Sequence, residues 1–165
     1  MDDGSMTLII ALVFLVACSA FFSASETAFS SLNQIRLKSR AEDGDASAAR
    51  VLAMAEKYDK LLSTILIGNN IVNIAAASIG TILFTRALGA ERGATMSTIV
   101  LTIVVLIFGE VTPKSLAKEM PETVATAVSP MLNLLMVLFT PLTWLFSQWK
   151  RLLGHFVHST EEDTI

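Results

Sequence analysis

Oxygen-bearing side chains gather in three apolar parts of this 165-residue sequence. The stretch "CSAFFSASETAFSS" carries several hydroxyls and Glu26, "GNNIVN" carries three asparagines, and "GEVTPK" carries Glu110. Hydroxyl, amide and carboxylate oxygens are hard ligands, which suit Mg²⁺, Ca²⁺ or Na⁺ better than zinc, copper or iron. A carboxylate in hydrocarbon is costly unless it faces a polar cavity or a partner. The pattern therefore predicts a cation site at membrane depth.

The spacing of these residues predicts which of them share a helix face. On a helix Ser19, Ser23 and Glu26 form one stripe, which Thr27 and Ser30 extend, whereas Ser25 projects off it unless the helix is broken. Asn70 and Asn73 lie three residues apart and share a face. Pro113 has no N–H and frees a carbonyl one turn earlier. A site with one carboxylate leaves bound Mg²⁺ with net positive charge, which favours weak binding and release.

Each of these residues also has a structural interpretation. Serine and threonine in membrane helices commonly pack or bond to their own backbone. Glu110 has Lys114 one turn later as a partner for an ion pair, and Glu26 has the alternative of an interfacial charge. His155 and His158 lie in a polar tail and are interpreted as solvated rather than metal-binding.

Composition defines the class of protein. Hydrophobic residues make up 53% of the chain and charged residues 16%, and the mean hydropathy is +0.61, which is typical of a membrane protein. No basic stripe interleaves with aromatic residues, so no nucleic-acid partner is expected. The single cysteine, Cys18, excludes an intrachain disulfide. The chain contains no HExxH or GxSxG motif, and we expect no enzyme activity.

We expect an all-α membrane protein that crosses the bilayer three times. The basic loop at residues 33–60, interpreted as a helical hairpin around "EDGD", places the N-terminus outside and the C-terminus in the cytoplasm. The apolar segment at 123–149 contains Pro130 and Pro141 and is expected to break there and lie along the inner leaflet, with a fourth crossing as the alternative. The expected spans cover residues 6–32, 61–85 and 96–113, and the expected belt covers residues 121–153.

Three motifs in order give a family resemblance. The stretches "FFSASETAFSSLNQIRLK", "LLSTILIGNNIVNIAAAS" and "FGEVTPKSLAKE" resemble the transmembrane domain of the CorC/CNNM (cyclin M-like) magnesium transporters. The resemblance covers residues 6–153 and implies a homodimer in the plasma or inner membrane, with three spans, short inner-leaflet helices and a juxtamembrane belt helix in each protomer. It implies that residues 154–165 begin a linker to cytosolic CBS domains, which bind ATP in that family.

The resemblance also implies a function and a ligand set. The expected function is Mg²⁺ transport. If transport runs outward against the membrane potential, we expect coupling to Na⁺ entry, with a passive, downhill Mg²⁺ pathway as the alternative. A carrier for Na⁺ or Ca²⁺ and a non-transporting Mg²⁺ sensor or scaffold are the alternatives. The metal ligands expected by resemblance are Ser23, Ser25, Asn70, Asn73, Glu110 and the Gly109 carbonyl, with the Gly68 carbonyl as a further donor. Residues expected to support them are Glu26, Asn69, Pro113 and Lys114.

Overall fold

The structure, a computed structural model, describes residues 3–164, with side chains for residues 4–157. Helices joined by short turns make up the described chain, and no strand occurs within residues 3–164. The elements are α1 (Asp3–Ser30), α2 (Gln34–Glu42), α3 (Ala46–Glu56), α4 (Tyr58–Leu88), α5 (Ala90–Val104), the π-helix η1 (Val105–Val111), α6 (Thr112–Glu119), α7 (Pro121–Leu138) and α8 (Thr140–Thr164). The all-α class is confirmed.

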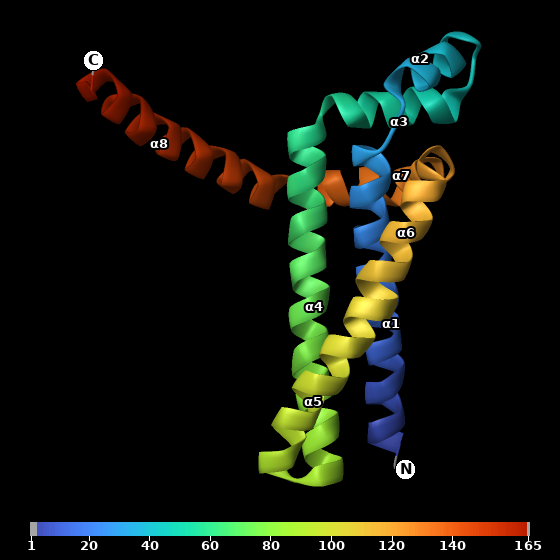
Figure 1. Ribbon diagram of the computed structural model, residues 1–165, viewed down its shortest axis with the longest axis vertical. Helices are drawn as coiled ribbons and strands as arrows, with labels where there is room; N and C mark the ends of the chain where they lie inside the picture. The colour runs from blue at the N-terminus through green and yellow to red at the C-terminus, as the bar shows by residue number, and fades with distance from the viewer. Residues whose placement is uncertain (1–2, 165) are drawn as a thin grey trace.

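Three long helical segments form the body of the molecule. Helices α1 and α4 run side by side with a third segment in which α5, η1 and α6 follow one another without a break (Figure 1). Large apolar side chains such as Val13, Phe14 and Ile74 are exposed on their outer faces, as expected for helices surrounded by lipid. The segments long and apolar enough to cross a membrane are Gly4–Ser30, Tyr58–Leu88, Ala90–Glu119 and Pro121–Leu138. The chain is therefore a multi-pass membrane protein.

Helices α7 and α8 run in another direction. Figure 1 shows α7 lying across one end of the bundle and α8 extending away from it. The expectation that Pro130 breaks this segment is wrong, because α7 continues through Pro130 to Leu138. The Ser129 hydroxyl donates a 3.0 Å hydrogen bond to the Thr126 carbonyl, which lies four residues before Pro130 and receives no N–H from it. Pro141 falls in the first turn of α8, where an N–H has no helical acceptor.

The predicted helical hairpin at residues 33–60 is confirmed. Helices α2 and α3 are joined at Gly44, whose φ of 98° lies in the left-handed region that glycine adopts readily. Asn33 caps α2 by accepting a hydrogen bond from the Arg36 N–H. Asp45 caps α3 by accepting hydrogen bonds from the N–H groups of Ser47 and Ala48, at 3.0 and 3.2 Å.

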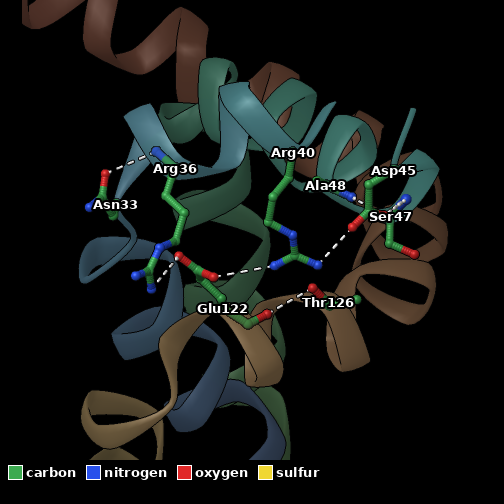
Figure 2. A network of polar contacts seen from close by, with 8 residues as sticks. All are labelled: Asn33, Arg36, Arg40, Asp45, Ser47, Ala48, Glu122 and Thr126. Atoms are coloured by element: carbon green, nitrogen blue, oxygen red, sulfur yellow. Dashed lines mark hydrogen bonds and ion pairs between the residues drawn. The ribbon is translucent and has the colours of Figure 1, made fainter. Parts of the chain in front are cut away.

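The hairpin is joined to α7 by both apolar and ionic contacts. The largest buried cluster of apolar residues lies at this end of the molecule and includes Leu37, Val51, Leu61 and Leu132. Figure 2 shows the ionic contacts: one guanidinium bridges two carboxylates from different elements. Arg40 lies 2.7 Å from Asp45 and 3.2 Å from Glu122, and Arg36 lies 3.8 Å from Glu122.

Candidate cation site

Three helices meet at one level in the middle of the bundle. The Ser19 hydroxyl of α1 is buried and donates a 3.3 Å hydrogen bond to the side-chain oxygen of Asn69 in α4. Gly109 of η1 lies against the same serine, because a Cβ built on Gly109 would lie 3.1 Å from the Ser19 hydroxyl oxygen. The three motifs found in the sequence therefore come together, with Glu110 next along the chain.

The backbone at "GEVTPK" departs from the α-helix. Residues Val105–Val111 form a π-helix, and the Thr112 N–H accordingly donates to the Ile107 carbonyl, five residues earlier. Pro113 is buried, and because it has no N–H it cannot donate to the Gly109 carbonyl four residues earlier. Single π turns inside α-helices occur frequently at functional sites.

Glu110 is the only acidic residue of η1, and its side chain is half-buried. The ion pair with Lys114 that the sequence allows is not formed between these two described residues. Burial without a cationic partner leaves the carboxylate available to a bound cation.

Asn73 of α4 holds a polar atom without a partner. Its side-chain oxygen is buried and accepts no hydrogen bond from the described residues. It lines a cavity of about 300 Å³ between α4, α5 and η1, together with Thr102 and Val105. A water molecule occupies roughly 30 Å³ in the liquid, so there is room for water beside Asn73 and Thr102, the two polar residues of a lining that is otherwise apolar. A buried oxygen left unpaired costs about 1–3 kcal/mol, which makes this atom a candidate for a ligand.

The remaining predicted ligands and supporting residues differ in how far their side chains are buried. Ser23 and Ser25 are both buried, and the Ser25 hydroxyl donates a 2.7 Å hydrogen bond to the Phe21 carbonyl of its own helix. That bond is the backbone interaction expected of serines in membrane helices, and it leaves the oxygen lone pairs free. Asn70 is exposed on the surface of this chain, and Glu26 is half-buried.

The structure thus brings together part of the predicted set. Asn69 contacts the serine stripe of α1, and Asn73 lies one turn further along α4, whereas Asn70 does not face this junction. Ser19 and Thr102 lie outside the predicted ligand set. Ser19 lies on the polar stripe predicted for the first helix and Asn69 is among the predicted supporting residues, and their i, i+4 spacings from Ser23 and Asn73 are the signal that links both to the ligand set.

Comparison with known proteins identifies the family of the chain. The chain belongs to the CNNM family, because its residues 10–164 match the Cyclin M transmembrane N-terminal domain. The resemblance seen in the sequence motifs is therefore confirmed.

Several curated relatives share this domain. The inner membrane protein YfjD of Escherichia coli K12 is 47% identical over 135 residues, which are 82% of this chain and 31% of that protein. A UPF0053 protein of Haemophilus influenzae is 40% identical over 151 residues, covering 92% of this chain and 36% of its own length. The polyamine export protein of E. coli K12 is 32% identical over 151 residues, covering 84% of this chain and 34% of that protein. The chain spans about a third of the length of these relatives.

Proposed function

We propose that this domain transports Mg²⁺ across the inner or plasma membrane through oxygen ligands at the junction of α1, α4 and η1. The observation that carries the proposal is the buried, unpaired side-chain oxygen of Asn73, beside a cavity of about 300 Å³ and one turn from the Ser19–Asn69 hydrogen bond. Membership of the CNNM family supports a transporter-like role.

The chemistry of the junction fits a weakly held, hard cation. Mg²⁺ takes about six oxygens at about 2.0–2.1 Å and keeps several waters, so a cavity with a few protein oxygens suits it. In the proposal Glu110 supplies the one carboxylate, and the Gly109 carbonyl, left without a donor from Pro113, supplies a backbone oxygen. The other proposed ligands at the junction are Ser23, Ser25 and Asn73, with Ser19 and Asn69 orienting them. Asn70, which the sequence also suggested, is exposed and does not face the junction, so it is not included.

The proposed topology has three crossings and a belt. In this arrangement α1, α4 and the α5–α6 segment span the bilayer, and α7 and α8 lie along the inner leaflet, which is supported by their direction in Figure 1. The cations at the hairpin end, among them Arg36, Lys38 and Arg40, favour a cytoplasmic hairpin and an external N-terminus. A homodimer and cytosolic CBS domains in the longer protein complete the proposal.

Outward transport needs an energy source. Moving two positive charges out against 100 mV, inside negative, costs about 4.6 kcal/mol. The sequence contains no P-loop motif for nucleotide hydrolysis, so entry of Na⁺ is the proposed source. Proteoliposomes loaded with Mg²⁺ and held at fixed membrane potential test this coupling. Faster efflux with Na⁺ outside supports exchange, and identical efflux under opposite Na⁺ gradients contradicts it.

The ligand role of Glu110 is tested by a conservative substitution. We expect Glu110→Gln to lower Mg²⁺ flux at least tenfold and to weaken Mg²⁺ binding measured by calorimetry, because the site loses its one carboxylate. Glu119→Gln is the matched control, since Glu119 is exposed at the end of α6. Wild-type affinity and flux in Glu110→Gln would remove Glu110 from the site. If the wild-type protein binds Mg²⁺ but shows no Mg²⁺ flux, the alternative function as a non-transporting Mg²⁺ sensor or scaffold would be favoured.

A second candidate cargo is a polyamine. Relatives at 32% identity carry the name polyamine export protein, and the carboxylate and amide oxygens of the junction also suit ammonium groups. Flux of labelled spermidine, measured in the same proteoliposomes, separates the two cargoes. Spermidine transport that Glu110→Gln abolishes, without Mg²⁺ transport in the wild type, would replace Mg²⁺ by polyamine as the cargo.

A further inference from the structure

Two neighbouring cavities open beside the N-terminal end of α4. One, of about 330 Å³, lies between α4 and α8 and is lined in part by Lys60, Trp144 and Lys150. The other, of about 210 Å³, lies between α3, α4 and α7 and is lined in part by Arg50, Lys57 and Lys60. Lys60 lines both cavities, so they adjoin at the start of α4. Their cationic lining, Arg50, Lys57, Lys60 and Lys150, is called the basic region below.

The charge of this region is not neutralised within the chain. Among the residues described with side chains, none of Arg50, Lys57, Lys60 and Lys150 forms an ion pair. Asp59 is the one carboxylate among the described residues that line the two cavities. Four cations against one carboxylate leave the lining with net positive charge, which attracts an anion. Hydroxyls of Ser63 and Thr143 and the amide of Asn133 add polar groups to the walls.

The walls are apolar as well as basic. Met136 and Val137 line the smaller cavity, and the exposed indole of Trp144 lines the larger one. Tryptophan is enriched where hydrocarbon meets the headgroup layer of a bilayer. The region also lies at the end of the bundle where α4 begins after α3 and from which α8 extends away (Figure 1). A ligand that matches these walls is anionic at one end and apolar at the other.

We propose that this basic region binds the phosphate-bearing headgroup of an anionic phospholipid, with the start of its acyl chains against Met136, Val137 and Trp144. Basic pockets between membrane helices on the cytoplasmic side recognise such headgroups. The bound lipid holds the first turns of α8 against α4, although most of α8 extends away from the rest of the molecule. The proposal does not depend on which cation the domain transports.

Trp144 provides a local reporter for the test. The chain has two tryptophans, so Trp149→Phe leaves Trp144 as the single fluorescent indole. This variant is reconstituted into phosphatidylcholine vesicles containing increasing fractions of phosphatidylglycerol with brominated acyl chains, which quench tryptophan on contact. Brominated phosphatidylcholine gives the reference. We expect phosphatidylglycerol to quench at several-fold lower mole fraction than phosphatidylcholine.

Charge variants assign that preference to this region. Lys60→Gln should lower the preference for phosphatidylglycerol about fivefold, the factor corresponding to about 1 kcal/mol per cation near a membrane surface. Arg50→Gln combined with Lys150→Gln should lower it further. Arg92→Gln is the matched control, because Arg92 is exposed near the α4–α5 turn at the other end of the bundle. Far-UV circular dichroism checks that each variant keeps its helices.

Three outcomes would overturn the proposal. Equal quenching by the two brominated lipids in the parent protein would show that no anionic headgroup is selected. A normally helical Lys60→Gln variant that keeps the full preference would show that the basic region is not the site. Displacement of the quenching lipid by millimolar inorganic phosphate would assign the cavities to free phosphate instead of lipid.

Discussion

Gly68, the glycine of "GNNIVN", is expected to be intolerant of any side chain. A Cβ built there would lie 2.2, 2.4 and 2.8 Å from three ring atoms of Phe22 in α1. Carbon atoms in contact are about 3.5–4.0 Å apart, so Gly68→Ala would have to move the ring or separate α1 from α4 by more than about 1 Å. Overpacking of this kind costs about 1–3 kcal/mol. Alanine in a helix recovers up to about 1 kcal/mol of that cost relative to glycine.

Comparison with Gly154→Ala separates the packing cost of Gly68→Ala from the gain in helix propensity. Gly154 also lies in a helix, α8, but a Cβ there meets no atom within 4 Å, so this variant should show the helix-propensity gain alone. The measurement is unfolding in mixed micelles of increasing denaturing detergent, followed by far-UV circular dichroism. The two variants should differ in unfolding free energy by about 1–3 kcal/mol, and Phe22→Leu should recover much of the loss in a double-mutant cycle. Equal stability of the Gly68→Ala and Gly154→Ala variants would refute the close contact of α1 with α4.

Two further predictions concern the hairpin and α7. The pKa of Asp45 is held below its ordinary value of 3.8, first by the hydrogen bond from the Ala48 N–H and then by the one from Arg40. Because its pKa is lower in the folded state, the ionised Asp45 carboxylate stabilises the hairpin above pH 3.8. That stabilisation is lost as the pH falls through the folded-state pKa and the carboxylate becomes protonated. The protection of amides in α2 and α3, measured as hydrogen exchange relative to the intrinsic rate at each pH, should therefore fall below pH 3.8 in the wild type, whereas Asp45→Asn should show no such step. Ser129→Ala should destabilise α7 by about 1 kcal/mol in detergent unfolding, because the Thr126 carbonyl loses its donor. Restoring an N–H with Pro130→Ala should recover that loss, and a Ser129→Ala variant as stable as the wild type would contradict the role of the hydroxyl.

Hydropathy and turn chemistry made much of the fold predictable. Long apolar segments without charges have few alternatives to membrane helices, so the expected spans at 6–32, 61–85 and 96–113 overlap α1, α4 and the α5–α6 segment. Pro121–Leu138 is also long and apolar enough to cross, so three crossings stay a prediction. The turn at Gly44 was predictable because "EDGD" combines a residue that adopts positive φ with acidic residues that cap helices.

The continuity of α7 was not predictable from Pro130 alone. The rule that proline breaks a helix assumes that the carbonyl four residues earlier stays unpaired. Here the neighbouring Ser129 hydroxyl supplies the missing donor, which is a contact that depends on side-chain rotamer rather than on composition.

Which asparagines of α4 face α1 could also not be predicted from the sequence. Helix α4 is apolar over most of its surface, so its periodicity does not indicate which face meets α1. Contact of Phe22 with Gly68 decides that rotation: it places Asn69 against Ser19 and leaves Asn70 on the outside. The three motifs predicted the level of the junction, whereas packing selects which amides face it.

The π-helix has a consequence for the alignment of the third segment. Each residue of an α-helix turns the chain by about 100°, so the extra residue in the wide turns of Val105–Val111 puts α6 out of phase with α5 by that rotation. Deleting one residue between Val105 and Phe108 and closing the wide turn to an α-helix would therefore leave Glu110 and Pro113 on nearly the same side of the helix relative to Thr102, whereas straightening the full sequence into an unbroken α-helix would turn them by about 100°. The face that the acidic motif presents to α1 therefore depends on the wide turn itself: the same letters in an unbroken α-helix would present a different face.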